Sequence, residues 1–290
     1  MNRAQIIHSA VAQQSISFPL PAAQPERNQW SQATGVRTGA RQNALLKALP
    51  DDDLTRLLEH LELVNLPFGK YILECGNRLE HCYFPSSAVI SLVYVMKDGA
   101  TTELAVVGGE GVVGVSLFDG ERATSTAIVQ HGGYAYRLKS RYLREAFMQG
   151  GALPGLLMRH SNVLFMQMAQ TVVGGQHFTV EQKVARWLLE HLDRSHSTEL
   201  KATHAIIADM LGVRRESVTM IAGRLQDAGL IQYRRGYVTV IDRVGLQRQA
   251  SQCSTKAETT MEAGGQASRQ PMKYRCRTST THPEPRIHCA

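Results

Sequence analysis

Arginines and short polar side chains gather between residues 203 and 235 in a pattern suited to nucleic acid. The run Arg214-Arg215-Glu216-Ser217 opens a predicted helix, and Thr219 lies one turn further on. Arginine can donate two hydrogen bonds to a guanine, glutamate can accept one from a cytosine, and threonine can contact a thymine methyl group. We therefore predict that Arg214, Arg215, Glu216 and Thr219 contact base edges.

A second set of side chains in this region suits phosphate groups. Hydroxyl and guanidinium groups bind phosphate oxygens and position a protein on DNA without specifying the sequence. On an isolated helix, a merely solvated charged face would be the favoured interpretation, but the neighbouring elements favour DNA contact. The predicted phosphate-contacting residues are Thr203, Ser217, Arg224, Arg234 and Arg235.

The elements that must position these residues form a helix-turn-helix followed by a hairpin. The pattern predicts a helix from Thr203, its N-cap, to Met210, and then a glycine-containing turn over 211–213. A second helix is predicted over Arg214–Ala228, ending at Gly229. Two β-rich runs on either side of Arg234-Arg235-Gly236 predict a wing.

Charge is distributed in the way that such a surface requires. Residues 199–248 hold eight basic and five acidic side chains, whereas residues 41–150 hold 11 basic and 13 acidic ones. The excess of positive charge therefore coincides with the predicted helix-turn-helix, as phosphate binding requires.

Upstream, between Val64 and Leu138, short β-rich runs alternate with turns. Asp98-Gly99 between two such runs is a strong hairpin signal. Several short strands at this spacing predict an antiparallel sandwich or barrel. The clearest runs are Tyr71–Leu73, Val89–Met96, Thr102–Val107, Thr126–Gln130 and Tyr134–Leu138.

Helices flank this β region. Leucines at helical spacing predict two short helices between residues 45 and 61, with Asp51 or Asp52 capping the second. A long helix is predicted over 153–173, and its pattern leaves open whether it packs on its own domain or pairs with a second copy. A further amphipathic helix is predicted over 180–192.

Composition limits the class of protein. Of the 290 residues, 43% are hydrophobic, and the formal net charge of +7 is compatible with a nucleic-acid partner without establishing one. The chain has no apolar run of about 18 residues and no secretory signal, which predicts a cytoplasmic protein with no membrane partner. Five cysteines without a CxxC pattern indicate neither a disulfide framework nor a standard zinc site.

At its helix-turn-helix the chain resembles the Crp/Fnr family of bacterial transcription regulators. The most specific match is Ile207-Ala208-Asp209-Met210-Leu211-Gly212-Val213-Arg214-Arg215-Glu216-Ser217-Val218-Thr219, continued over 225–231. The resemblance extends over about 41–248. Supporting matches are 184–189, Tyr83-Phe84-Pro85 and 108–114.

The resemblance implies an α+β protein built from three parts. These are a cyclic-nucleotide-binding-like antiparallel β-roll sensor at 41–150, a long dimerisation helix at 151–176 and a winged helix-turn-helix at 177–248. Composition adds disordered ends at 1–40 and 249–290. The resemblance also implies a homodimer that binds palindromic double-stranded promoter DNA and regulates transcription, with RNA polymerase as a further partner.

The sensor departs from the cyclic-AMP-binding members of the family. Those members carry a glycine-glutamate pair that holds the ribose and an arginine that meets the phosphate. Here Val115 follows Gly114, and Thr124 stands at the arginine position, with Arg122 two residues away. Valine cannot accept the ribose hydrogen bonds, and threonine cannot neutralise a phosphate. We therefore expect an effector other than cyclic AMP, bound near these four residues. Met220 likewise replaces an arginine of the cyclic-AMP-responsive members, which puts their operator sequence in doubt.

No cofactor or metal is predicted. Residues 1–74 hold no cysteine, so the iron–sulfur cluster of the oxygen-sensing branch is not expected. Haem stays open, with His160 or His177 as a ligand, although each is more simply a surface or interface histidine.

Two other classes of function compete. One is a ligand-binding β-roll whose winged helix contacts another protein, although an interface of that kind would usually be less basic. The other is an enzyme, which the absence of GxSxG, Walker A and HExxH patterns disfavours.

Overall fold

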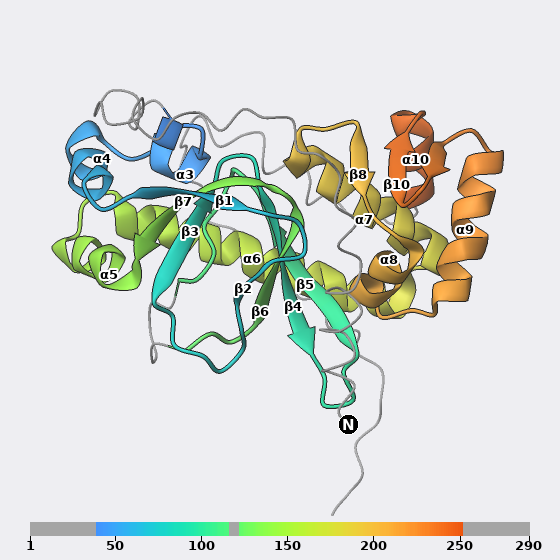
Figure 1. The fold of residues 1–290 in the computed structure, drawn as a ribbon, viewed down its shortest axis with the longest axis horizontal. Coiled ribbons are helices and arrows are strands. Elements are labelled where there is room, and N and C mark those ends of the chain that lie inside the picture. The colour runs from blue at the N-terminus through green and yellow to red at the C-terminus, as the bar shows by residue number, and fades with distance from the viewer. Residues whose placement is uncertain (1–38, 116–121, 252–290) are drawn as a thin grey trace, which may run out of the picture. The chain divides into compact units, whose positions relative to one another are not determined.

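The computed structural model describes residues 39–115 and 122–251 (Figure 1). The ends predicted to be disordered, 1–40 and 249–290, lie outside the described residues apart from 39–40 and 249–251. The described part of the chain forms eight helices, α3 to α10, and ten strands.

Two antiparallel sheets form the predicted β-roll. One has the strand order β1-β7-β3 and the other the order β2-β6-β4-β5. Leu66, Ile90, Val107 and Val129 are fully or almost fully buried in one apolar cluster of these strands. The strands are β1 Glu62–Leu66, β2 Tyr71–Leu73, β3 His81–Pro85, β4 Val89–Val95, β5 Thr101–Val107, β6 Thr126–His131 and β7 Gly133–Lys139.

Three short helices pack beside the β-roll: α3 (Ala44–Lys47), α4 (Asp51–Leu58) and α5 (Ser140–Gln149). The prediction that Asp51 or Asp52 caps α4 is wrong. The cap position is Pro50, which makes no side-chain hydrogen bond, and Asp51, Asp52 and Asp53 all lie in the first turn. From there the aspartates stabilise the helix through its dipole rather than as caps.

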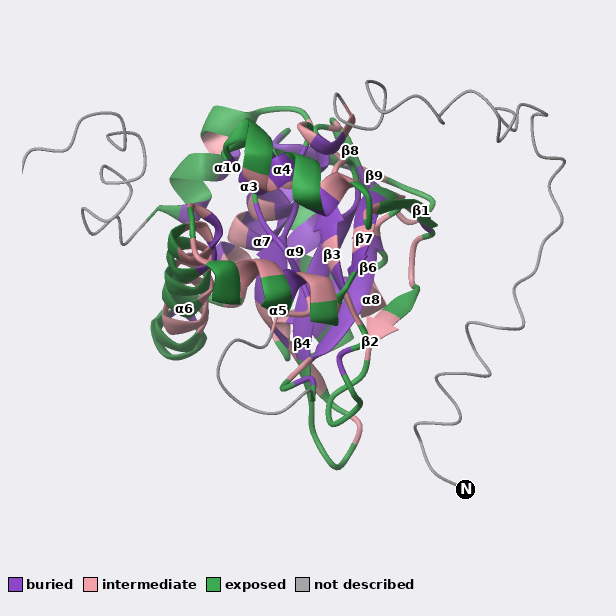
Figure 2. Cartoon of the chain, turned by 90° about the vertical axis from the view of Figure 1, so that its left-hand side faces the viewer, coloured by how far each residue is buried: buried purple, intermediate pink, exposed green. Residues whose placement is uncertain are grey.

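The long helix α6 (Leu153–His177) packs one face on the β-roll and leaves another exposed. Gln167 accepts a hydrogen bond from the backbone of Val106, and Thr171 donates one to the carbonyl oxygen of Leu104. The opposite side carries exposed Met158 and Phe165, and Figure 2 shows this green face at the edge of the molecule. The helix therefore packs on its own domain and still presents an apolar surface.

The remaining elements form the predicted winged helix. Its small sheet has the order β8-β10-β9. The sequence pattern did not predict β8 or α10. The elements are α7 Val180–Ser195, β8 Glu199–Lys201, α8 His204–Leu211, α9 Arg215–Asp227, β9 Ile231–Arg234, β10 Tyr237–Val240 and α10 Arg243–Ala250.

The core of the winged helix continues into the β-roll. Trp187 and Leu188 of α7 belong to the same buried cluster as Ile207, Val218 and Leu225 of the helix-turn-helix, and this cluster also contains two β-roll residues, Val93 and Ile128. None of the helices in the described ranges combines the length and apolar character that crossing a membrane requires.

Candidate nucleic-acid interface

Helix α8 is fixed at both ends by local chemistry. The hydroxyl oxygen of Thr203 accepts a hydrogen bond of 3.2 Å from the backbone of Ile206, so the predicted N-cap is confirmed. At the other end Gly212 has φ +62, a left-handed conformation that glycine adopts at little cost. This turn directs the chain into α9, as a helix-turn-helix requires.

Helix α9 presents its first turn to solvent. Arg214 is the N-cap and makes no side-chain capping bond, because a guanidinium group cannot accept one. Arg214, Arg215 and Glu216 are exposed, whereas Val218 and Leu225 on the inner face are buried. Three of the four predicted base-contacting residues therefore lie together at the end of the helix that enters the major groove in such motifs.

Thr219, the fourth predicted base contact, is held by its neighbours. Its hydroxyl donates a hydrogen bond of 3.1 Å to the carbonyl oxygen of Arg215 and lies 3.0 Å from Nδ1 of His204. These contacts engage the hydroxyl and leave the methyl group available for a thymine. Burial, followed by the nearby charge of Arg215, lowers the pKa of His204.

Sequence reasoning missed the role of His204. Its ring lies with its centroid 4.3 Å from that of Tyr233 on β9, and its Nδ1 contacts α9. It therefore joins the two helices to the wing. The available signal was its position as the first residue of α8, directly after the N-cap.

The wing brings two of the predicted phosphate contacts together. Arg235 has φ +50 and Gly236 φ +83, the pair of positive values that a type I′ hairpin turn requires. The backbone of Ala202 donates a hydrogen bond of 2.9 Å to the carbonyl oxygen of Gly236, which places the tip of the wing beside Thr203. Thr203, Arg234 and Arg235 are exposed.

The other two predicted phosphate contacts lie on α9. Ser217 is half-buried in the first turn, and Arg224 is exposed in the last turn. The guanidinium of Arg224 lies 3.8 Å from Sδ of Met220, which is itself exposed on the same face. Arg224 is therefore separated from the cluster at the start of the helix.

The four predicted effector residues lie close to a cavity but do not line it. Gly114 has φ +87 and Val115 packs against apolar core residues. Nη1 of Arg122 donates a hydrogen bond of 2.7 Å to the carbonyl oxygen of Gly76, and the carbonyl oxygen of Thr124 lies 3.4 Å from Sγ of Cys75. Arg122 and Thr124 thus tie this segment to the turn after β2.

The neighbouring cavity has a volume of about 260 Å³. Its charged lining comes from the segment 74–81 and includes Glu74, Arg78, Glu80 and His81. Ala123, between the predicted residues Arg122 and Thr124 in the sequence, also lines it. Sequence reasoning missed these residues. The alternation of acidic and basic side chains over 74–81 was the available signal.

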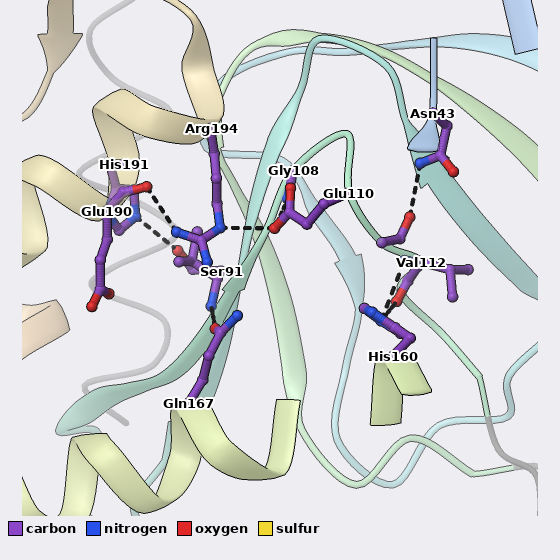
Figure 3. Close-up of polar contacts among 12 residues, drawn as sticks. Asn43, Ser91, Gly108, Glu110, Val112, His160, Gln167, Glu190, His191 and Arg194 are labelled. Carbon is purple, nitrogen blue, oxygen red and sulfur yellow. Dashed lines mark hydrogen bonds and ion pairs between the residues drawn. The ribbon is translucent and has the colours of Figure 1, made fainter. Parts of the chain in front are cut away.

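The histidines considered as haem ligands have different surroundings. Nε2 of His160 lies 2.8 Å from the carbonyl oxygen of Val112, a contact that ties α6 to the loop after β5 (Figure 3). This nitrogen is already used by the backbone, so His160 fits a structural role. His177 is exposed at the end of α6. Within the described ranges no group of three or more His, Cys, Asp or Glu side chains is arranged to hold a metal ion.

Two family models match the chain at these regions. Residues 63–149 match the cyclic nucleotide-binding domain, and residues 182–249 match the Crp-like helix-turn-helix domain. The chain belongs to the Crp/Fnr family of transcription regulators. It is therefore a DNA-binding transcription regulator with a cyclic-nucleotide-binding-like β-roll.

Individual relatives of this Crp/Fnr regulator are distant. The global nitrogen regulator of Synechococcus elongatus is 23% identical over 202 residues, which are 66% of this chain and 90% of that protein. A structure described as a transcriptional regulator of the Crp/Fnr family from Eubacterium rectale is 18% identical with a TM-score of 0.59, over 72% of this chain and 99% of that one. FixK2 of Bradyrhizobium japonicum is 16% identical with a TM-score of 0.57, over 65% and 96% of the two chains. The structural matches establish the fold.

Proposed function

We propose that this regulator binds promoter DNA as a homodimer and responds to an effector other than cyclic AMP. The observation that carries the proposal is the exposed first turn of α9, where Arg214, Arg215 and Glu216 lie side by side on a helix whose inner face is buried. Two such helices related by a two-fold axis would contact two half-sites one DNA turn apart.

The exposed face of α6 supports the homodimer. Met158, Phe165 and Val172 are 52%, 66% and 63% exposed and follow one another at intervals of seven residues. Side chains at this spacing form one stripe along a helix and pair with the same stripe on a second helix. A second copy of the chain would cover apolar surface that water otherwise contacts.

The division of roles on the DNA follows from side-chain chemistry. Arg214, Arg215, Glu216 and Thr219 are proposed to contact bases. The residues proposed to contact backbone phosphates lie near the first turn of α9, in its last turn or on the wing. They are Thr203, Ser217, Arg224, Arg234 and Arg235.

The effector is proposed to bind in the β-roll near Gly114, Val115, Arg122 and Thr124. Val115 and Thr124 lack the groups that would hold a ribose and a phosphate, which argues against cyclic AMP. Calorimetry that detected micromolar, stoichiometric cyclic AMP binding would refute this. We further propose that the regulator works in the bacterial cytoplasm, contacts RNA polymerase at the promoter and has no catalytic activity of its own.

Selection of bound sequences from a random duplex pool tests the DNA site and the symmetry together. The purified protein without added ligand should enrich a two-fold symmetric sequence. No enrichment, with or without metabolites from a cell extract, would favour the alternative that the winged helix contacts a protein.

Phe165→Glu tests the dimer directly. A carboxylate in the centre of the stripe should weaken self-association by about 30-fold or more, the effect of losing a central interface residue worth about 2 kcal/mol. Sedimentation of the variant at several concentrations measures this. Met148→Glu is the matched control, because Met148 is an exposed apolar residue of α5 away from the stripe. Equal association of the two variants would contradict the proposed interface.

A further inference from the structure

A buried polar cluster joins the β-roll to the first helix of the winged helix. It consists of Ser91 on β4, Glu103 on β5 and His191 on α7, and the side chains of Glu103 and His191 are only 9% and 3% exposed. Nε2 of His191 lies 3.2 Å from a carboxylate oxygen of Glu103 and 3.4 Å from the hydroxyl of Ser91. Ser91 donates a hydrogen bond to the same carboxylate oxygen. Figure 3 shows His191 and Ser91 facing one another.

The geometry determines how many protons the cluster holds. Nδ1 of His191 lies 2.9 Å from the carbonyl oxygen of Trp187, which can only accept, so Nδ1 carries a proton. The hydroxyl proton of Ser91 is used on Glu103. The contact between Nε2 and the carboxylate therefore needs a further proton, held on either side. Without it, a ring lone pair would face a buried carboxylate oxygen, an arrangement that costs free energy.

We infer that Ser91, Glu103 and His191 form a proton-dependent latch, which holds α7 against the β-roll while the shared proton is present and releases it when that proton is lost to solvent. The latch opens as the pH rises and the shared proton is lost. Because the two groups are coupled, the proton belongs to the pair and not to either residue alone.

The other charged groups around His191 do not replace this proton. The charged groups of α7 near His191 are Glu190, Arg186 and Arg194. On α10, Arg243 forms an ion pair with Asp193 of α7. Arg194 is occupied by Glu110, with Nε 2.8 Å from its carboxylate. Glu190 extends in a different direction in Figure 3. Its pKa is raised first by burial and then by the charge of Glu103, so Glu190 is the neighbouring group that a pH experiment must distinguish.

The other polar contacts between the two regions are exposed or do not titrate. Nε2 of Gln130 lies 3.3 Å from Sδ of Met210 in a buried contact, but neither group titrates. The Arg194–Glu110 pair and the hydrogen bond from Thr101 to the carbonyl oxygen of Asp209 both involve exposed groups. Exposed pairs contribute little because water replaces them, whereas a buried pair that loses one partner leaves the other uncompensated. The buried cluster is therefore the contact most sensitive to a change of protonation.

Tryptophan fluorescence tests the latch in the full chain. Trp187 and Trp30 are the two tryptophans, and the Trp187 ring centroid lies 4.0 Å from that of His191. In a Trp30→Phe background, loss of the shared proton or displacement of the ring changes the emission of Trp187. We expect one transition as the pH rises.

Two variants with matched charge changes locate the proton. Glu103→Gln should abolish the transition, because its amide can donate to Nε2 at every pH and no shared proton is required. Glu190→Gln removes the adjacent carboxylate and should keep the transition. Persistence of the transition in Glu103→Gln, or its loss only in Glu190→Gln, would overturn the assignment.

DNA affinity reports whether the latch acts on the winged helix. Affinity for a duplex recovered by selection should change about fivefold or more across this pH range, a typical size for coupling between sites, and should stay constant in Glu103→Gln. This second measurement rests on the proposed function, whereas the fluorescence measurement does not. A fluorescence transition with unchanged DNA affinity would retain the buried proton but overturn the latch.

Discussion

The first turn of α9 exposes its polar side chains, whereas the contacts between the β-roll and the helices bury theirs. Arg214, Arg215 and Glu216 lie in water at the start of α9. Asn43, in contrast, is fully buried at the start of α3 and uses its whole amide. Its nitrogen donates to the carbonyl oxygens of Pro85 and Gly111, and its oxygen accepts from the backbone of two residues of α3. Figure 3 shows one of the contacts of the amide nitrogen.

Exposed and buried polar groups therefore suit different functions. Exposed guanidinium and carboxylate groups exchange water for bases or phosphates at modest cost, so they suit an external partner. Buried groups lose much more when a partner is removed, so they respond to changes inside the protein. The first kind suits the proposed contact with DNA, and the second kind provides contacts such as Glu103–His191 between the β-roll and the winged helix.

The largest expected effect tests whether the two regions unfold together. Leu188 is fully buried in the cluster that also contains Val93 and Ile128 of the β-roll. Leu188→Ala should lower the free energy of unfolding by about 2–5 kcal/mol through lost contacts and a cavity. Urea denaturation followed by circular dichroism should show one transition at a lower midpoint.

Leu138→Ala provides the matched comparison from the β-roll. Leu138 is also fully buried, but in the cluster formed by β3, β7 and the flanking helices. If each variant moved a different transition, the regions would unfold separately and the shared cluster would not couple them.

The winged helix could be predicted from its sequence in more detail than the β-roll. Thr203, Gly212 and Gly229 are local signals, since each acts within a few residues of its own position. Strands depend on partners far along the chain. β1 is mostly exposed and β3 begins with His81 and Cys82, so neither shows a clear alternation, and both depend on pairing with β7.

The same reason limits what the sequence says about sites. The predicted base-contacting residues lie within six positions of one another, 214–219, so they could be named from the sequence. The Ser91–Glu103–His191 cluster joins residues up to 100 positions apart, so it does not follow from spacing along the chain.

Loss of one base contact has the next largest effect. Arg215→Ala should weaken binding to the selected site by about 1–3 kcal/mol and relax the preference at one base pair, because a bidentate contact with guanine is removed. Repeating the selection with the variant checks this. An unchanged preference at every position would mean that Arg215 contacts no base.

Arg235→Ala should have a smaller and less specific effect. A phosphate contact at the tip of the wing adds affinity for every sequence, so its loss should weaken specific and random duplexes alike. The slope of log affinity against log salt should fall by about one. A loss confined to the selected site would mean that Arg235 contacts bases and that the division of roles is wrong.

The smallest expected effect concerns His160, a half-buried histidine of α6 that contacts the loop after β5. Burial lowers the pKa of His160 from its ordinary value of 6.5, partly opposed by the Val112 carbonyl and the charge of Glu110. The unfolded chain therefore binds a proton more readily than the folded one below that value. The contribution of His160 to the free energy of unfolding is therefore fully present above about pH 6.5, and it declines as the pH falls below that value.

His160→Gln should flatten this decline, because the amide can still donate to the Val112 carbonyl but does not titrate. The measurement is the urea midpoint of wild type and variant at several pH values, and the difference between them isolates one group from the carboxylates that also titrate. His177→Gln is the control, since His177 is exposed at the end of the same helix. If both variants followed the wild-type profile, the contact between His160 and Val112 would contribute nothing to acid sensitivity.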